Sequence, residues 1–190
     1  MLIDTDQIYK PSDDTFLLLR AALNELKSDD CVLEMGCGYG EISFEVMKHV
    51  KSLKAIDINP HAVNLCRSRG IDAALGDLFD GVTENFDLIL FNAPYLPTKP
   101  DERIDDWLEF ALDGGLSGRD TVDRFLTQAA SHLNDFGRIL LLISSLTDID
   151  EVLKLCKSNS LIAVISETEI IEDGDEVLYV LRISRDLCSV

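Results

Sequence analysis

The chain has 190 residues, of which 46% are hydrophobic, and this is ample for the core of one domain. Its 17 Lys and Arg residues against 35 Asp and Glu residues give a formal net charge of −18. A field of that sign repels phosphate backbones, so naked nucleic acid is a disfavoured substrate.

The sequence shows no sign of a targeting segment, a membrane span or a metal site. Residues 1–6 lack the basic and apolar regions of a signal peptide, and no segment approaches the roughly 20 apolar residues of a membrane span. The cysteines form no C-x-x-C pair and have no histidine at metal-ligand spacing; they are Cys31, Cys37, Cys66, Cys156 and Cys188. We expect reduced thiols, no bound metal, no membrane contact and a cytoplasmic protein.

Strands and helices alternate along almost the whole sequence. Ser12 can cap a helix that carries Asp13 and Asp14 in its first turn and runs toward Lys27. The next segments are predicted as strand 31–34, helix 42–50, strand 53–57, helix 60–69, strands 71–75 and 86–91, helix 119–133, strand 138–143, helix 148–157, and strands 161–168 and 176–183. Residues 170–175 form a turn, so the last two strands should pair antiparallel.

This order predicts an α/β fold with a doubly wound, mostly parallel seven-stranded sheet and a C-terminal antiparallel hairpin. No repeat or linker divides the sequence, so residues 1–190 are expected to form a single domain. The longest irregular stretch, 96–116, is predicted to be a loop that shapes the substrate entrance.

A glycine-rich turn, Glu34-Met35-Gly36-Cys37-Gly38-Tyr39-Gly40, follows the first predicted strand and leads into a helix. Glycines let the backbone approach a ligand at a helix N-terminus, although dinucleotide sites use G-x-G-x-x-G and not the G-x-G-x-G found here. Asp57, at the end of the second strand, can accept both hydroxyls of a ribose. Asp77, after the third strand, can accept the exocyclic amine of adenine. The two carboxylates suit a nucleoside better than a pyrophosphate.

The apolar strand 86–91 ends abruptly in Asn92-Ala93-Pro94-Tyr95. An amide side chain, a backbone carbonyl and an aromatic ring at this position can hold a planar NH2 group, which predicts chemistry on a nitrogen atom. All these features fall at the carboxyl ends of strands, where doubly wound sheets bind ligands.

Together the motifs resemble the class I S-adenosylmethionine-dependent methyltransferases that methylate amino groups and carry an (Asn/Asp)-Pro-Pro-Tyr motif. Tyr9-Lys10-Pro11-Ser12-Asp13-Asp14-Thr15 and Leu112-Asp113-Gly114-Gly115-Leu116-Ser117-Gly118 are similar to the HemK-like glutamine methyltransferases, which modify the Gly-Gly-Gln loop of peptide chain release factors. The lack of a separate amino-terminal helical domain resembles their short archaeal and eukaryotic branch. Ala93 replaces the first proline of the motif; it keeps the carbonyl but restricts the backbone less.

The resemblance implies S-adenosylmethionine as the cofactor, with S-adenosylhomocysteine as its product. The catalytic residues that it implies are Asn92, Ala93, Pro94 and Tyr95. The cofactor-binding residues that it implies are Pro11, Thr15, Glu34, Gly36, Cys37, Gly38, Gly40, Asp57, Ile58, Asp77, Leu78 and Asn92. Glu34 and the glycines would hold the amino-acid part of the cofactor, with Pro11 and Thr15 closing over it.

Strand 71–75 is expected at a sheet edge, and it is apolar for an exposed edge. The resemblance implies a partner there, a small zinc-binding activator protein of the Trm112 type that extends the sheet by strand addition. The alternative is a helix or loop of the same chain that covers the edge.

Other functions fit parts of the pattern. An adenine-N6 or guanine-N2 nucleic-acid methyltransferase also holds a planar NH2 group with a motif like Asn92-Ala93-Pro94-Tyr95, called here the amide holder, but the net charge of −18 argues against a nucleic-acid substrate. A protein-lysine methyltransferase does not need a holder for a planar amide, and a non-enzymatic cofactor-binding protein would be expected to lose Asn92 or Tyr95. A nicotinamide oxidoreductase fits least well, because the glycine spacing is wrong.

Overall fold

The computed structural model describes residues 3–99, 106–171 and 175–186. A seven-stranded sheet with the order β3-β2-β1-β4-β5-β7-β6 forms its centre. The strands are β1 (Cys31–Met35), β2 (Ser52–Asp57), β3 (Ala73–Leu75), β4 (Phe86–Asn92), β5 (Leu133–Ser144), β6 (Leu161–Ile170) and β7 (Val177–Arg185). Strands β1 to β5 are parallel, whereas β7 runs antiparallel to both β5 and β6. The predicted α/β fold with an antiparallel C-terminal hairpin is confirmed.

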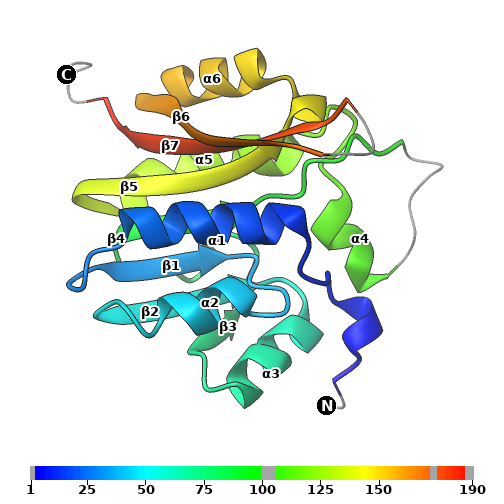
Figure 1. The fold of residues 1–190 in the computed structure, drawn as a ribbon, viewed down its shortest axis with the longest axis vertical. Coiled ribbons are helices and arrows are strands. Elements are labelled where there is room, and N and C mark those ends of the chain that lie inside the picture. The colour runs from blue at the N-terminus through cyan, green and yellow to red at the C-terminus, as the bar shows by residue number, and fades with distance from the viewer. Residues whose placement is uncertain (1–2, 100–105, 172–174, 187–190) are drawn as a thin grey trace.

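Helices cover both faces of this sheet (Figure 1). They are α1 (Asp13–Glu25), α2 (Glu41–Val46), α3 (Pro60–Ser68), α4 (Trp107–Leu112), α5 (Asp120–Ala129) and α6 (Ile149–Ser158), with short 3-10 helices at Thr5–Gln7, Ala130–His132 and Ser145–Thr147. Helices α1, α2 and α3 pack on one face, and α5 and α6 pack on the other.

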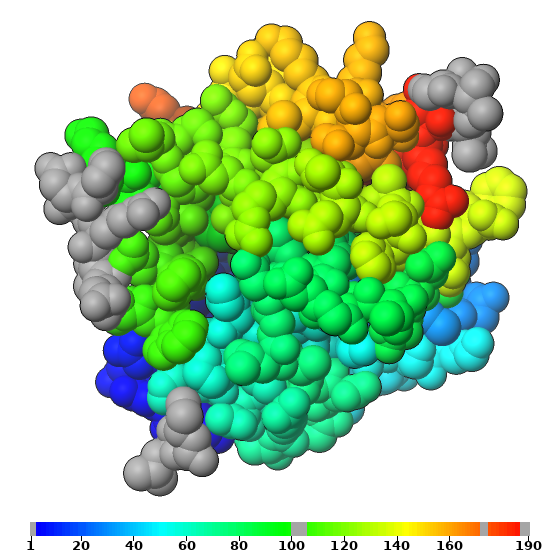
Figure 2. Space-filling model, turned by 180° about the vertical axis from the view of Figure 1, so that it is seen from behind, coloured from blue at the N-terminus to red at the C-terminus, as the bar shows by residue number. Residues whose placement is uncertain are grey.

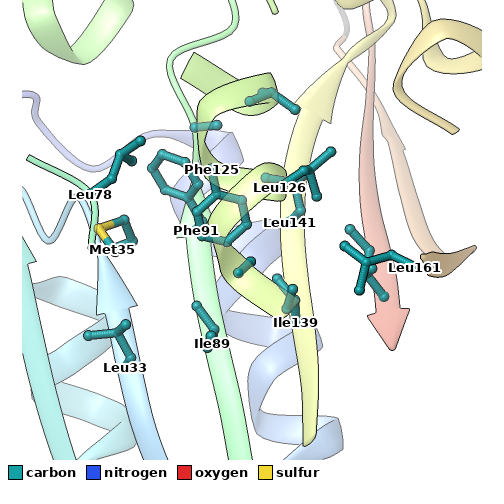
Figure 3. Packing of buried hydrophobic residues seen from close by; sticks show 14 of the residues in the cluster. Leu33, Met35, Leu78, Ile89, Phe91, Phe125, Leu126, Ile139, Leu141 and Leu161 are labelled. Carbon is teal, nitrogen blue, oxygen red and sulfur yellow. The ribbon is translucent and has the colours of Figure 1, made fainter. Parts of the chain in front are cut away.

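The alternation of residues along β4 joins the two layers of the core. Leu88 and Leu90 pack with α1 and α2, while Ile89 and Phe91 point toward α5. Figure 3 shows Phe91 beside Phe125 of α5, and their ring centroids lie 4.7 Å apart. A fully buried side chain of this kind stabilises the fold by about 1.5–3 kcal/mol. This packing anchors the carboxyl end of β4, where the Asn92 motif begins.

The starts of two helices follow the predicted capping signals. Ser12 caps α1 in a capping box with Thr15, and Asn59 caps α3 with Pro60 at its first position. The stretch that precedes α1 is held near the carboxyl end of β2, because the Asn59 side chain donates to the Gln7 carbonyl at 2.7 Å.

Several predicted boundaries were wrong. Helix α2 ends at Val46 and not at residue 50, because the N–H groups of Lys48 and His49 bond three residues back, as at a tightened helix end. Strand β5 begins at Leu133, inside the predicted helix 119–133, since Leu133 pairs with Phe86 across a shift in register. Strand β3 is limited to its last three predicted residues.

The predicted long loop 96–116 is not irregular throughout, because α4 lies within it. Residues 100–105 of that loop fall outside the described residues, as do residues 172–174 of the predicted turn between β6 and β7.

Candidate active site

A pocket of about 600 Å³ lies at the carboxyl ends of β1, β2 and β4. In the order of the strands, β1 and β4 are the neighbours between which the direction of the crossovers reverses, which is where open α/β sheets bind ligands. Seen from behind the sheet, a dark hollow opens between the cyan residues that follow β2 and the green residues of α4 and α5 (Figure 2).

Most of the predicted site residues meet in this pocket. Those that line it are Gly36, Gly38, Asp57, Ile58, Asp77, Leu78, Asn92, Ala93, Pro94 and Tyr95. An adjoining cavity of about 30 Å³ is lined by four more predicted residues: Pro11, Thr15, Glu34 and Cys37. Three predicted residues line both spaces: Gly36, Gly38 and Asn92.

Gly40 alone among the predicted residues lines neither space. A Cβ atom at Gly40 would lie 2.7 Å from the Cys66 sulfur and 2.8 Å from Cδ1 of Ile71, and its φ is +74°. The close packing of the turn against α3 therefore explains why position 40 needs a glycine, independently of the cofactor role predicted for it.

Asn92 carries an unpaired acceptor at the end of β4. Its Oδ1 atom is buried and has no hydrogen-bond partner within the described part of the chain, where no other buried side-chain nitrogen or oxygen shares this condition. Leaving such a group unsatisfied costs about 1–3 kcal/mol. Because Asn92 lines both cavities, this acceptor is available to an N–H group of a ligand.

Asp57 fastens the glycine-rich turn to the end of β2. Its Oδ2 atom accepts from the Gly38 N–H at 2.8 Å, and its Oδ1 atom accepts from the Asn59 N–H at 2.8 Å. Burial raises the pKa of this carboxyl above its ordinary value, and the two backbone hydrogen bonds oppose that rise. Each oxygen retains a lone pair, so the carboxylate can still accept from two hydroxyl groups.

Asp77 has a partner that the sequence did not reveal. Arg124 of α5 donates to Asp77 Oδ2 at 2.7 Å, and both side chains line the pocket. The two side chains are 55% and 37% exposed, so the ion pair adds at most about 1 kcal/mol of stability. The bond occupies Oδ2, which leaves Oδ1 for a ligand amine.

Glu34 lies beneath the glycine-rich turn. It is 4% exposed and accepts a hydrogen bond from the Ser43 hydroxyl of α2. Burial raises the pKa of Glu34 to about 8. Nearby, the Cys37 and Cys66 sulfurs are 3.4 Å apart, and the hydrogen bond to Cys66, together with burial, raises the pKa of Cys37.

The second loop motif packs on the backbone of the Asn92 motif. The Leu96 N–H donates to the Leu112 carbonyl at 3.2 Å, and the Gly114 N–H donates to the Leu96 carbonyl at 2.9 Å. A Cβ atom at Gly118 would lie 2.5 Å from the Tyr95 carbonyl oxygen, and φ is +70° there. Only glycine allows this approach, so residues 112–118 support the backbone of residues 92–95 by direct packing.

Tyr9, Asp14 and Glu176 are among the pocket residues that were not predicted. Tyr9 and Asp14 belong to the motif of residues 9–15, which leads into α1, but only Pro11 and Thr15 of that motif had been predicted to bind the cofactor. Glu176 immediately precedes β7, and its Oε1 accepts from the Ser144 hydroxyl at 2.6 Å. The sequence carried no local signal for it, because its nearness to β4 depends on the packing order of the strands.

Within residues 3–99, 106–171 and 175–186, no group of three or more His, Cys, Asp or Glu side chains could hold a metal ion. No helix in those same ranges is long and apolar enough to cross a bilayer. The cysteines that these ranges contain, Cys31, Cys37, Cys66 and Cys156, are free, and Cys188 lies outside them.

The chain is similar to known methyltransferases. The family model of the methyltransferase small domain matches residues 10–106. A Methanocaldococcus jannaschii protein named "Putative protein N5-glutamine methyltransferase" is 42% identical over 80% of this chain and 79% of its own length. Human methyltransferase HEMK2 is 31% identical over 94% of this chain and 90% of its own.

A solved structure matches as well. It is the E. cuniculi Mtq2–Trm112 complex, described as responsible for methylation of the eRF1 translation termination factor. The match has a TM-score of 0.78 and 25% identity, and it covers 94% of this chain and 99% of the other.

Proposed function

Since the chain belongs to the HemK-like protein N5-glutamine methyltransferases, we propose that it transfers a methyl group from S-adenosylmethionine to the side-chain amide nitrogen of the glutamine in the Gly-Gly-Gln loop of a peptide chain release factor. The unpaired Oδ1 of Asn92, buried at the end of β4, carries this proposal, because a primary amide supplies the N–H donor that it lacks. We take residues 1–190 as one methyltransferase domain that acts in the cytoplasm.

The pocket fits this cofactor in size and chemistry. A volume of about 600 Å³ falls within the range of small-molecule sites. Asp57 would bind the ribose hydroxyls, Asp77 the adenine amine, and Glu34 with the glycine-rich turn the amino-acid part. Ile58 and Leu78 line the pocket next to the two aspartates and would contact the nucleoside. When bound, S-adenosylmethionine supplies a methyl group on a positively charged sulfur.

The chain's main catalytic contribution would be to position the target nitrogen. An amide nitrogen is a poor nucleophile because its lone pair is delocalised into the carbonyl group. Asn92 Oδ1 and the Ala93 carbonyl would each accept one N–H of the target, which fixes the amide in line with the methyl group and favours the localised lone pair. Pro94 would fix the turn and Tyr95 would pack over the amide plane. No strong base is needed, because the proton leaves after the nitrogen has become positive.

We also propose a Trm112-type zinc-binding activator at the edge strand β3, the last three residues of the predicted segment Ile71 to Leu75. In the described part of the chain β3 ends the sheet, and Leu75 is 60% exposed. The match to a complex containing Trm112 supports this partner. The same chain covers the strand only in part, since Arg67 of α3 donates to the Ala73 carbonyl at 2.8 Å.

Radiolabel transfer tests the function. Purified release factor and its Gln→Ala variant in the Gly-Gly-Gln loop are each incubated with labelled S-adenosylmethionine, with and without the zinc-binding partner. Label on the unaltered factor alone would establish glutamine methylation, and dependence on the partner would establish the activator. Label on neither factor, with cofactor still bound, would favour RNA or lysine as the target.

A further inference from the structure

A buried carboxylate joins two tyrosines at the wall of the pocket. Asp14 is the second residue of α1, is 4% exposed and lines the pocket. Its Oδ2 atom accepts from the Tyr9 hydroxyl at 2.9 Å and from the Tyr95 hydroxyl at 3.4 Å. The start of α1 is thereby tied to the end of β4, 81 residues away in the sequence.

The other oxygen of Asp14 is fixed to its own helix. Oδ1 accepts from the Thr15 N–H at 2.5 Å and from the Thr15 hydroxyl at 3.1 Å. The positive end of the α1 dipole also stabilises a carboxylate in the first turn. With hydrogen bonds on both oxygens, the Asp14 side chain is a rigid link and not a mobile surface group.

The tyrosines serve this link as neutral donors. Burial, followed by the negative charge of Asp14, raises the pKa of Tyr9 and of Tyr95 well above the ordinary value. A hydroxyl that keeps its proton can donate to Asp14 throughout the neutral range, but it cannot act as a base there. The contribution of both rings is therefore geometric.

We propose that Asp14 is a positioning residue for methyl transfer: through the Tyr95 hydroxyl it fixes the ring that covers the target amide, and through the Tyr9 hydroxyl it fixes a second residue of the pocket lining. The inference rests on the proposed function, in which Tyr95 packs over the amide plane. Tyr9 lines both cavities, so it lies at the boundary between them. A displacement of 1 Å in such a site lowers the rate by about 100-fold.

A double-mutant cycle on kcat separates positioning from a purely structural role. Asp14→Asn, Tyr95→Phe and the double variant are compared at saturating cofactor. We expect each single change to lower kcat by about 10- to 100-fold, and the double variant to be no slower than the slower single variant, because both changes break the same link. Asp13→Asn is the matched control: it removes a charge from the same helical turn, but Asp13 is exposed, so kcat should not change.

Independent, multiplying effects of the two changes would overturn the proposal, as would an Asp14→Asn variant with reduced thermal stability but wild-type kcat. If Asp14→Asn does not fold, Tyr95→Phe decides alone, because it removes the hydroxyl and keeps ring and carboxylate; unchanged kcat then refutes the link.

The wild-type enzyme separates this inference from the proposed function. If it does not label a release factor, the proposed function fails, and a double-mutant cycle in thermal unfolding then judges the link without substrate. The stability losses of Asp14→Asn and Tyr95→Phe should not add in the double variant, because both changes break the same hydrogen bond. Additive losses would overturn the assignment of Asp14.

Discussion

Replacement of Asn92 by alanine tests the amide holder directly. The change removes the unpaired Oδ1 acceptor and leaves the main chain, so the Ala93 carbonyl remains in place. The anchor of this segment also remains, because Phe91 is held by its contact with Phe125 and not by the Asn92 side chain. The variant should therefore fold like the wild type.

The expected loss follows from the number of acceptors. With one of two acceptors gone, one N–H of the target stays unpaired in a buried site, which costs about 1–3 kcal/mol. Removing one preorganised polar group from comparable catalytic sites costs about 2.7–4 kcal/mol, or a factor of 100 to 1,000 in kcat. We expect a loss of kcat in that range, with cofactor affinity near the wild-type value, because Asp57 and Asp77 are unchanged.

Single-turnover transfer of labelled methyl groups to a release factor measures the loss, and calorimetry with S-adenosylhomocysteine measures affinity. A variant that keeps near wild-type turnover would refute the role of Asn92. Equal losses of turnover and of cofactor affinity would mean that the side chain serves the cofactor and not the target amide.

Three other changes test separate parts of the site. Asp57→Ala should weaken cofactor binding by about 1.5–3 kcal/mol, the value of a hydrogen bond to a charged group, and unchanged affinity in calorimetry would mean that the ribose assignment is wrong. Gly118→Ala should lower kcat, because its Cβ would lie 2.5 Å from the Tyr95 carbonyl oxygen. Gly81→Ala is the control: φ is +77° there, but no atom lies within 4 Å of the added Cβ. It should show only the backbone strain, a loss of about 1–2 kcal/mol in thermal unfolding. Burial raises the pKa of Glu34 to about 8 in the folded chain from an ordinary 4.5, so protonation of Glu34 favours the folded state. Thermal stability without ligand should therefore fall as the pH rises from 4.5 to 8 and then level off. Glu34→Gln should reduce this dependence of stability on pH. If Glu34→Gln leaves the dependence of thermal stability on pH unchanged, Glu34 is not its cause.

Features set by neighbouring residues were predictable from the sequence. The capping of α1 by Ser12 and the abrupt end of β4 at Asn92 depend on a few consecutive residues, and the apolar strands imposed the parallel sheet. Contacts between distant segments were not predictable, because nothing in the sequence states which side chains meet. Arg124 reaches Asp77 across 47 residues, and Asp14 reaches Tyr95 across 81.

Two errors have a similar origin. The start of β5 was placed too late because Leu133 joins the sheet through pairing with β4 and not through the pattern of its own segment. The glycines of the turn were read alike, yet Gly38 lines the pocket whereas Gly40 packs against Cys66 and Ile71. A glycine required by a ligand and one required by a close neighbour look the same in a sequence.

The carboxylates around the pocket have a consequence for product inhibition. Among the described residues of its lining, the acidic ones are Asp14, Asp57, Asp77, Glu109, Asp113 and Glu176, and the basic one is Arg124. Such a lining attracts a sulfonium and has no comparable attraction for the neutral thioether that remains after transfer. We expect the enzyme to release its spent cofactor readily at low ionic strength, and added salt to narrow the difference in affinity between the two forms.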